Sequence, residues 1–173
     1  MKRVRSEELG DMVHFFQAAA DVANGATCQR ARCGSVIVKD GRIVGSGYNG
    51  PPLGDESRRT CSETWDYTKK SKYDLTCCVH AEWRAVIDAC KNNPADVSGS
   101  TLYFMRTNQQ GNFTDAGVPY CTTCSRFVME SGVAEFALWN DNGADVYRMD
   151  EYDALSYEFY RDDSVTGLST DAP

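Results

Sequence analysis

The chain has 173 residues, of which 42% are hydrophobic, and its 18 basic and 25 acidic residues give a formal net charge of −7. This length predicts one domain over residues 1–173, and the acidic balance argues against a polynucleotide partner, because binding to a phosphate polymer depends on Lys and Arg. No segment has the roughly 20 apolar residues of a membrane span, and the N-terminus lacks the apolar core of a secretory signal, so we expect a soluble, cytoplasmic protein that acts on a small molecule.

The first part of the chain predicts a helix followed by a β-hairpin. Apolar residues recur at helical spacing over residues 6–25, after a serine that can cap the helix. Two β-rich runs, 35–39 and 42–46, then flank Asp40 and Gly41. An Asp-Gly pair between such runs is the strongest short-range signal for a hairpin, so these runs are predicted to pair in antiparallel orientation.

The rest of the chain predicts alternating helices and strands after a long loop. A strand, a helix and a second strand in succession require a parallel pair with a right-handed crossover. We therefore predict an α/β fold with a mixed sheet, helices on its faces and a frayed C-terminus over residues 160–173. The predicted elements are a loop at 51–76, a helix at 80–91, a strand at 101–106, a polar insertion at 107–118, a helix at 121–130, a strand at 133–139, a weaker strand at 145–149 and a helix at 152–160.

Two predicted helix starts carry residues that bind metals. His80 and Glu82 open one helix, and Cys121 and Cys124 open another, with a spacing that places both thiols on one face of the first turn. Alone, Cys-x-x-Cys is also typical of a redox pair or of half a structural site. One His and two Cys with an open fourth position are the pattern of a catalytic zinc site, because structural sites are closed by four protein ligands.

The residue types also predict the chemistry of such a site. Zinc lowers the pKa of bound water to about 7, which supplies hydroxide at neutral pH. Glu82 stands two residues from His80, close to the metal without binding it. A carboxylate in that position can take a proton from the water and pass it to a ring nitrogen and a leaving amine, so Glu82 is the predicted general acid and base.

His80-Ala81-Glu82 followed by a Cys-x-x-Cys resembles the H-x-E and P-C-x-x-C signature of zinc deaminases. With the segment CQRARCGSVIVKDGRIVGSGYNGPP and the later VHAE, the chain resembles the deoxycytidylate deaminase branch of the cytidine deaminase superfamily over roughly residues 7–140. The resemblance implies a three-layer fold with a five-stranded sheet. It also implies a hydrolytic deaminase that attacks C4 of a cytosine nucleotide and releases ammonia.

The same resemblance implies further site residues and partners. Asn49, in the GYNG segment, is implied to contact the nucleotide, and Arg30 or Arg32 is implied by position to bind its phosphate. Tyr120 flanks the predicted site as an aromatic residue that can stack on a pyrimidine. Members of the family are often homo-oligomers, with a hexamer favoured here and a dimer or tetramer as alternatives. Some are regulated by deoxycytidine and thymidine triphosphates, which implies Mg²⁺ bound with such an effector.

Five cysteines lie between the predicted first helix and His80. Some members of the family bind a second, structural zinc in this region, and four of these thiols are enough for a closed Cys₄ site. The alternative is that they are ordinary buried or surface thiols. The five are Cys28, Cys33, Cys61, Cys77 and Cys78.

Three features depart from the family pattern. Tyr120 separates Pro119 from the first zinc-binding cysteine, Arg84 stands where the family often has Asn, and residues 107–118 form an insertion before the metal loop. Two alternatives to a deoxycytidylate deaminase therefore stay open. One is a deaminase of another base or nucleoside, or of a polynucleotide such as transfer RNA or single-stranded DNA, and the other is a non-catalytic zinc-binding module of the same fold.

Overall fold

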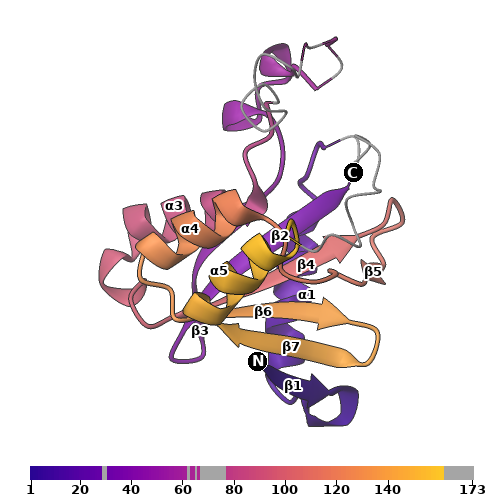
Figure 1. Cartoon of the computed structure of the whole chain (residues 1–173). Coiled ribbons are helices and arrows are strands. Elements are labelled where there is room, and N and C mark those ends of the chain that lie inside the picture. Colours follow the sequence, from indigo (N-terminus) through magenta and orange to yellow (C-terminus); the bar gives the residue numbers. More distant parts are fainter. Residues whose placement is uncertain (29–30, 62, 65, 67–76, 162–173) are drawn as a thin grey trace.

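A single mixed sheet organises the computed structural model, which describes residues 1–28, 31–61, 63–64, 66 and 77–161 (Figure 1). Its strands follow the order β1-β7-β6-β4-β2-β3, with β5 paired to β4 outside that row. Only the β4–β6 pair among these is parallel, which confirms the predicted mixed α/β sheet. The strands are β1 (Lys2–Arg5), β2 (Arg32–Lys39), β3 (Arg42–Tyr48), β4 (Thr101–Thr107), β5 (Phe113–Thr114), β6 (Glu135–Asn140) and β7 (Gly143–Arg148).

Helices cover both faces of the sheet and make three layers (Figure 1). One helix, α1, packs on one face, and α3, α4 and α5 lie on the other. Strand alternation divides the core in the same way: on β4, Leu102 and Phe104 join the cluster under α3 to α5, whereas Tyr103 and Met105 join the cluster under α1. The helices are α1 (Met12–Ala23), α3 (Ala81–Asn92), α4 (Thr122–Glu130) and α5 (Met149–Glu158).

The predicted hairpin is present and longer than expected. Asp40 and Gly41 both have positive φ, 49° and 73°, as the turn between β2 and β3 requires. Val36 and Ile37 of β2 are fully buried, because helices cover both faces of this interior strand. The hairpin therefore places β2 between β4 and β3, one strand in from the edge of the sheet.

Helix α3 approaches β3 unusually closely. A Cβ atom added at Gly47 would lie 2.4 Å from the backbone nitrogen of Ala85 and 2.5 Å from the carbonyl oxygen of Ala81. Real Cβ atoms do not approach other atoms at such distances, so only glycine fits there. Gly47 therefore sets how near the first turns of α3 lie to the sheet.

Several predicted boundaries were wrong because long-range pairing decides them. The predicted first helix begins as a short 3₁₀ turn at Ser6–Glu8, and α1 itself starts at Met12. The sheet also has two short strands that were not predicted, β1 beside β7 and β5 inside the 107–118 insertion. Of the C-terminal residues predicted to fray, 162–173 lie outside the described residues.

The described helices are also too short to cross a bilayer. Across the part of the chain that the structure describes, no helix is both long enough and apolar enough to span a membrane.

The predicted loop at 51–76 falls partly outside the described residues, and its described part includes two short 3₁₀ turns, Pro52–Gly54 and Glu56–Arg58.

Candidate functional site

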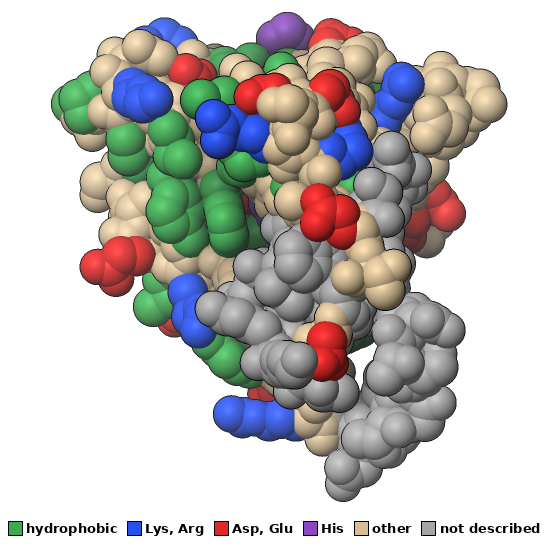
Figure 2. Space-filling model, turned by 90° about the horizontal axis from the view of Figure 1, so that it is seen from above, with side chains coloured by type: hydrophobic (Ala, Val, Ile, Leu, Met, Phe, Trp, Pro, Cys, Tyr) green, Lys and Arg blue, Asp and Glu red, His purple; other side chains and the backbone are tan. Residues whose placement is uncertain are grey.

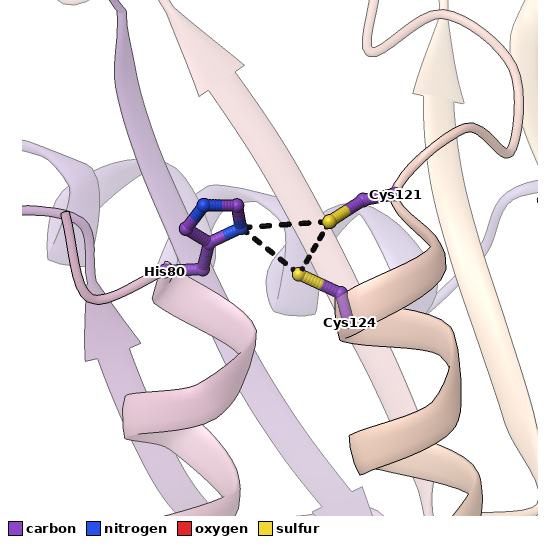
Figure 3. A group of neighbouring side chains, drawn as sticks. All are labelled: His80, Cys121 and Cys124. Carbon is purple, nitrogen blue, oxygen red and sulfur yellow. Dashed lines mark hydrogen bonds between the residues drawn. The ribbon is translucent and has the colours of Figure 1, made fainter. Parts of the chain in front are cut away.

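The side chains of His80, Cys121 and Cys124 meet between two helix starts (Figure 3). His80 is the N-cap residue of α3, and Cys121 is the N-cap residue of α4, so both helices begin at the ligands themselves. The Nδ1 atom of His80 lies 3.0 Å from Sγ of Cys124 and 3.6 Å from Sγ of Cys121. The crossover from β4 through α4 to β6 brings the start of α4 to the same end of the sheet as the start of α3.

This donor set fits zinc. One imidazole nitrogen and two thiol sulfurs lie within 4.8 Å of one another, and among the described residues they form the only such group of three His, Cys, Asp or Glu ligands. Zn–N bonds of about 2.0 Å and Zn–S bonds of about 2.3 Å bring tetrahedral ligands to within about 4 Å of each other. His80, Cys121 and Cys124 would hold the ion, which leaves one position open to a ligand.

Mutual hydrogen bonds already polarise the three ligands. The hydrogen bond with Cys124 lowers the pKa of Cys121 to about 4, with help from His80. Burial acts to lower the pKa of His80, but the hydrogen bond with Cys121 and the charge of Glu82 outweigh it and raise that pKa to about 9. A thiolate and an imidazolium therefore face each other, and a metal that binds here must displace the imidazole proton.

Glu82 lies beside the three ligands and is itself buried. Its side chain hydrogen bonds with the thiol of Cys124, and the charges of His80 and Cys121 act on it. Only 6% of the residue is exposed, and burial raises the pKa of its carboxyl group. The predicted proton carrier is therefore next to the metal ligands and outside the ligand set.

Neighbouring side chains hold the ligands in place. The ring of Trp83 stacks on that of His80 with centroids 5.3 Å apart and planes 22° apart, and Phe127 of α4 lies against Trp83. Next to Cys124, the hydroxyl of Ser125 donates to Asp153 of α5 at 2.6 Å. These contacts tie α3 and α5 to α4, which fixes the orientation of the groups that would bind the metal.

The GYNG segment is fastened to the strand beside it. Asn49 accepts a hydrogen bond from the backbone of Cys33 and donates one to the carbonyl of Ala31, both at 2.9 Å. Arg84 donates to the carbonyls of Gly50 and Pro51, and its guanidinium lies 5.1 Å from the centre of the Tyr48 ring. Asn49 and Arg84 therefore shape the loop that leads from β3 past the site.

One side chain near the site was missed by sequence reasoning. Arg106, at the carboxyl-terminal end of β4, donates a hydrogen bond to the hydroxyl of Tyr120 at 3.4 Å and contacts the thiol of Cys33. Tyr120 directly precedes the ligand Cys121. The available signal was strand alternation, since Arg106 occupies the next inward position after Phe104.

The other predicted residues are placed differently. Arg32 stands one position from Cys33 on β2, so its side chain leaves the opposite face of the sheet from Cys33 and Arg106. Arg30 lies outside the described residues. Of these two arginines, the structure describes only Arg32, and its side chain lies away from the face that carries the metal ligands.

All eight cysteines are thiols, and four of the five upstream ones form pairs. Cys28 hydrogen bonds with Cys78, and Cys61 with Cys77. Cys33 instead accepts a hydrogen bond from Arg106, and burial and the charge of Glu82 raise its pKa to about 12.

Charged side chains are scattered on the face seen in Figure 2, where Lys and Arg alternate with Asp and Glu. A protein that tracks a nucleic-acid backbone needs a continuous basic groove. The part of this face that the structure describes shows no such track, in agreement with the net charge of −7.

The sequence has relatives of known name. Residues 11–139 match the family described as the cytidine and deoxycytidylate deaminase zinc-binding region. The deoxycytidylate deaminase of Mycobacterium phage D29 is 31% identical over 69% of this chain and 87% of its own length. The Saccharomyces cerevisiae deoxycytidylate deaminase is 28% identical over 80% of this chain, which spans only 38% of that longer protein.

Solved structures show the same fold. A dCMP deaminase from cyanophage S-TIM5, solved in complex with dCMP and dUMP, superposes with a TM-score of 0.52 at 22% identity over 78% of this chain and 82% of its own. A cytidine deaminase from Burkholderia pseudomallei superposes with a TM-score of 0.54 at 17% identity over 81% of this chain and 94% of its own. The predicted cytidine-deaminase-like fold is confirmed, with β1 and β5 added to the five expected strands.

Proposed function

The chain belongs to the cytidine and deoxycytidylate deaminase zinc-binding family, and we propose that it is a zinc-dependent hydrolase that converts deoxycytidylate, or a close cytosine nucleotide, to the uracil nucleotide and ammonia. One observation carries this proposal. His80, Cys121 and Cys124 converge with one position open, and the buried carboxylate of Glu82 touches Cys124. A non-catalytic zinc module has no use for that carboxylate.

The chain supplies the proton transfers of the reaction. Bound zinc would lower the pKa of a water molecule towards neutrality. Hydrolysis moves both protons of that water, one to ring nitrogen N3 of cytosine and one to the amine that leaves as ammonia. Glu82 carries them at its carboxylate, because it stands beside the metal ligands and its burial favours the protonated form.

The substrate assignment rests on the relatives and on the charge of the protein. The phage D29 and yeast relatives are named deoxycytidylate deaminases, and the net charge of −7 favours a small nucleotide over a polynucleotide. Asn49 is proposed as a substrate residue, since only one of its two amide hydrogens is given to Ala31. Tyr120 is proposed to contact the base. Of the two arginines predicted to bind the phosphate, Arg30 is kept as the proposal, because the side chain of Arg32 leaves the face of the sheet opposite the metal ligands.

A substrate panel tests the proposal. Zinc-loaded protein is offered deoxycytidylate, cytidylate, deoxycytidine, cytidine, guanine and a single-stranded oligonucleotide, and the ammonia released is measured. We expect turnover of deoxycytidylate. Turnover of the oligonucleotide alone would replace this proposal by a polynucleotide deaminase, and no turnover at all would favour the non-catalytic module.

A variant pair tests the mechanism. Glu82→Gln is expected to keep stoichiometric zinc and to lose at least about 10²-fold in kcat, because the amide cannot carry the protons. Glu130→Gln, an exposed change at the end of α4, is the matched control and should leave kcat unchanged. Normal turnover by Glu82→Gln would remove the assigned role.

Other predictions from the sequence remain predictions. They are the second zinc, Mg²⁺ with a triphosphate effector, the homo-oligomer and the cytoplasmic location. For the second zinc, the pairs Cys28–Cys78 and Cys61–Cys77 are the available thiols. Metal analysis that finds two zinc ions per chain, falling to one in Cys61→Ala, would bear it out, whereas one ion in the unmodified protein would end it.

A further inference from the structure

Arg106 occupies an unusual position for a charged side chain. It sits opposite Cys33 in the β2–β4 ladder, on the face of the sheet that α3, α4 and α5 cover. The inward residues before it on β4, Leu102 and Phe104, belong to the hydrophobic core. Strand alternation therefore sends a guanidinium inwards at the end of the sheet where the metal ligands meet.

Within the described residues, the guanidinium is not neutralised by an acidic partner. Its hydrogen bonds go to the hydroxyl of Tyr120 and to the thiol of Cys33, whose pKa is raised by burial. No ion pair among the described residues includes Arg106, and its Nε atom is buried without a hydrogen-bond partner. A partly buried cation that has only neutral partners and one buried, unpaired N–H group is costly, which points to a ligand that completes it.

Arg106 lies close to the residues that are proposed to carry out the reaction. Tyr120 directly precedes the ligand Cys121, and the charge of Glu82 acts on both Tyr120 and Cys33. The charges that act on Glu82 itself are those of His80 and Cys121. Arg106 therefore lies beside Tyr120 and Cys33, near the metal ligands, and no ion pair within the described residues joins it to Glu82.

We propose that Arg106, held by the hydroxyl of Tyr120, is a specificity-determining residue that donates hydrogen bonds to an oxygen-bearing substituent of the cytosine nucleotide. This inference rests on the proposed function. An oxygen acceptor, and above all an anionic one, matches the fixed fork of donors on a guanidinium. The substituent is either the 5′-phosphate or an oxygen-bearing group on the pyrimidine ring, and both offer Arg106 an oxygen acceptor.

Tyr120 is the extra residue between Pro119 and Cys121, and its hydroxyl accepts the hydrogen bond from Arg106. A proline directly before the first cysteine, as in the zinc deaminase signature, has no side-chain group that can accept a hydrogen bond from Arg106. Tyr120 supplies a hydroxyl there, and its ring packs on Phe159 with centroids 6.0 Å apart. The tyrosine and the arginine thus form one polar wall beside the ligands.

Steady-state kinetics of zinc-loaded Arg106→Gln, Arg106→Lys and unmodified protein test the proposal on deoxycytidylate, deoxycytidine and 5-hydroxymethyldeoxycytidylate. We expect Arg106→Gln to lose roughly 10- to 100-fold in kcat/KM on the substrate that carries the recognised oxygen, mainly through KM. The loss on the analogue without that oxygen should be less than about threefold. Arg148→Gln, an exposed arginine on β7, is the control and should change nothing.

The pattern of loss identifies the oxygen. A loss confined to the two nucleotides assigns the phosphate, and a loss confined to the 5-hydroxymethyl compound assigns the ring substituent. An equal loss on all three substrates, or no loss on any, overturns the proposal.

Binding measurements distinguish a failure of this inference from a failure of the proposed function. If the unmodified protein turns over none of the three, the proposed function fails, and calorimetric binding of the same compounds then tests Arg106 by the same selective pattern. If Arg106→Gln does not fold with full zinc, Tyr120→Phe removes a single oxygen and should weaken the same substrate selectively. A uniform effect of Tyr120→Phe would count against the proposal.

Discussion

The close approach of α3 to β3 makes Gly47→Ala a sharp test of how the sheet positions the metal site. The new Cβ would lie 2.4 Å from the backbone nitrogen of Ala85 and 2.5 Å from the carbonyl oxygen of Ala81. Non-bonded contacts of a carbon atom ordinarily begin at about 3.4 Å, so α3 must move away from β3 by about 1 Å. The nearest atoms on the helix side are these two backbone atoms and the Cβ of Arg84, so no flexible side-chain end can absorb the movement.

This retreat should affect both stability and activity. Overpacking of this kind costs about 1–3 kcal/mol of the free energy of unfolding. The same movement displaces His80 and Glu82, which open α3, relative to the cysteines of α4. Because a misplacement of about 1 Å can cost about 10²-fold in rate, we expect kcat/KM to fall by that order and zinc to bind more weakly.

Thermal unfolding, zinc analysis and turnover of deoxycytidylate by Gly47→Ala measure the effect. Ser46→Ala is the matched control, because it lies next to Gly47 on the other face of β3 and keeps its backbone bond to Asp88. It should stay within about 0.5 kcal/mol of the unmodified protein. A Gly47→Ala protein with unchanged melting temperature, full zinc and kcat/KM within twofold would refute this account.

Three further changes probe the site. Cys124→Ala removes one of the three metal ligands, so both zinc content, measured by metal analysis, and turnover should be lost, and full zinc with normal activity would contradict the ligand set. Asp153→Ala leaves the hydroxyl of Ser125 without its carboxylate acceptor, so the free energy of unfolding should fall by about 1–3 kcal/mol and zinc should be released faster to a chelator. Unchanged release would show that this hydrogen bond does not support the metal ligands. Arg84→Met frees the carbonyls of Gly50 and Pro51, so KM should rise several-fold with zinc content unchanged, and an unaltered KM would show that this loop does not position the substrate.

Much of the metal site was predictable because its signals are local. A His-x-Glu and a Cys-x-x-Cys at two helix starts place their side chains by the geometry of the first turn, and His80 and Cys121 are indeed N-cap residues. The hairpin and the parallel crossover were predictable for the same reason, since turn chemistry and chain order decide them.

Other features depend on partners far along the chain. β1 exists because residues 2–5 pair with β7, and β5 exists because two residues of the insertion pair with the end of β4. The short segments themselves have no pattern strong enough to predict a strand. The predicted helix began at residue 6, but the chain forms a 3₁₀ turn at Ser6–Glu8 instead, directly after it leaves β1.

By itself, the sequence determined the family, the three metal ligands and the carboxylate beside them, because those residues act through spacing within single helical turns. Only the tertiary structure decided that Arg106 turns inwards to Tyr120, that Arg32 leaves the opposite face, and that Asn49 clamps the start of β2. These placements follow from strand register and from the packing of elements distant in the chain, which a pattern of neighbouring residues does not encode.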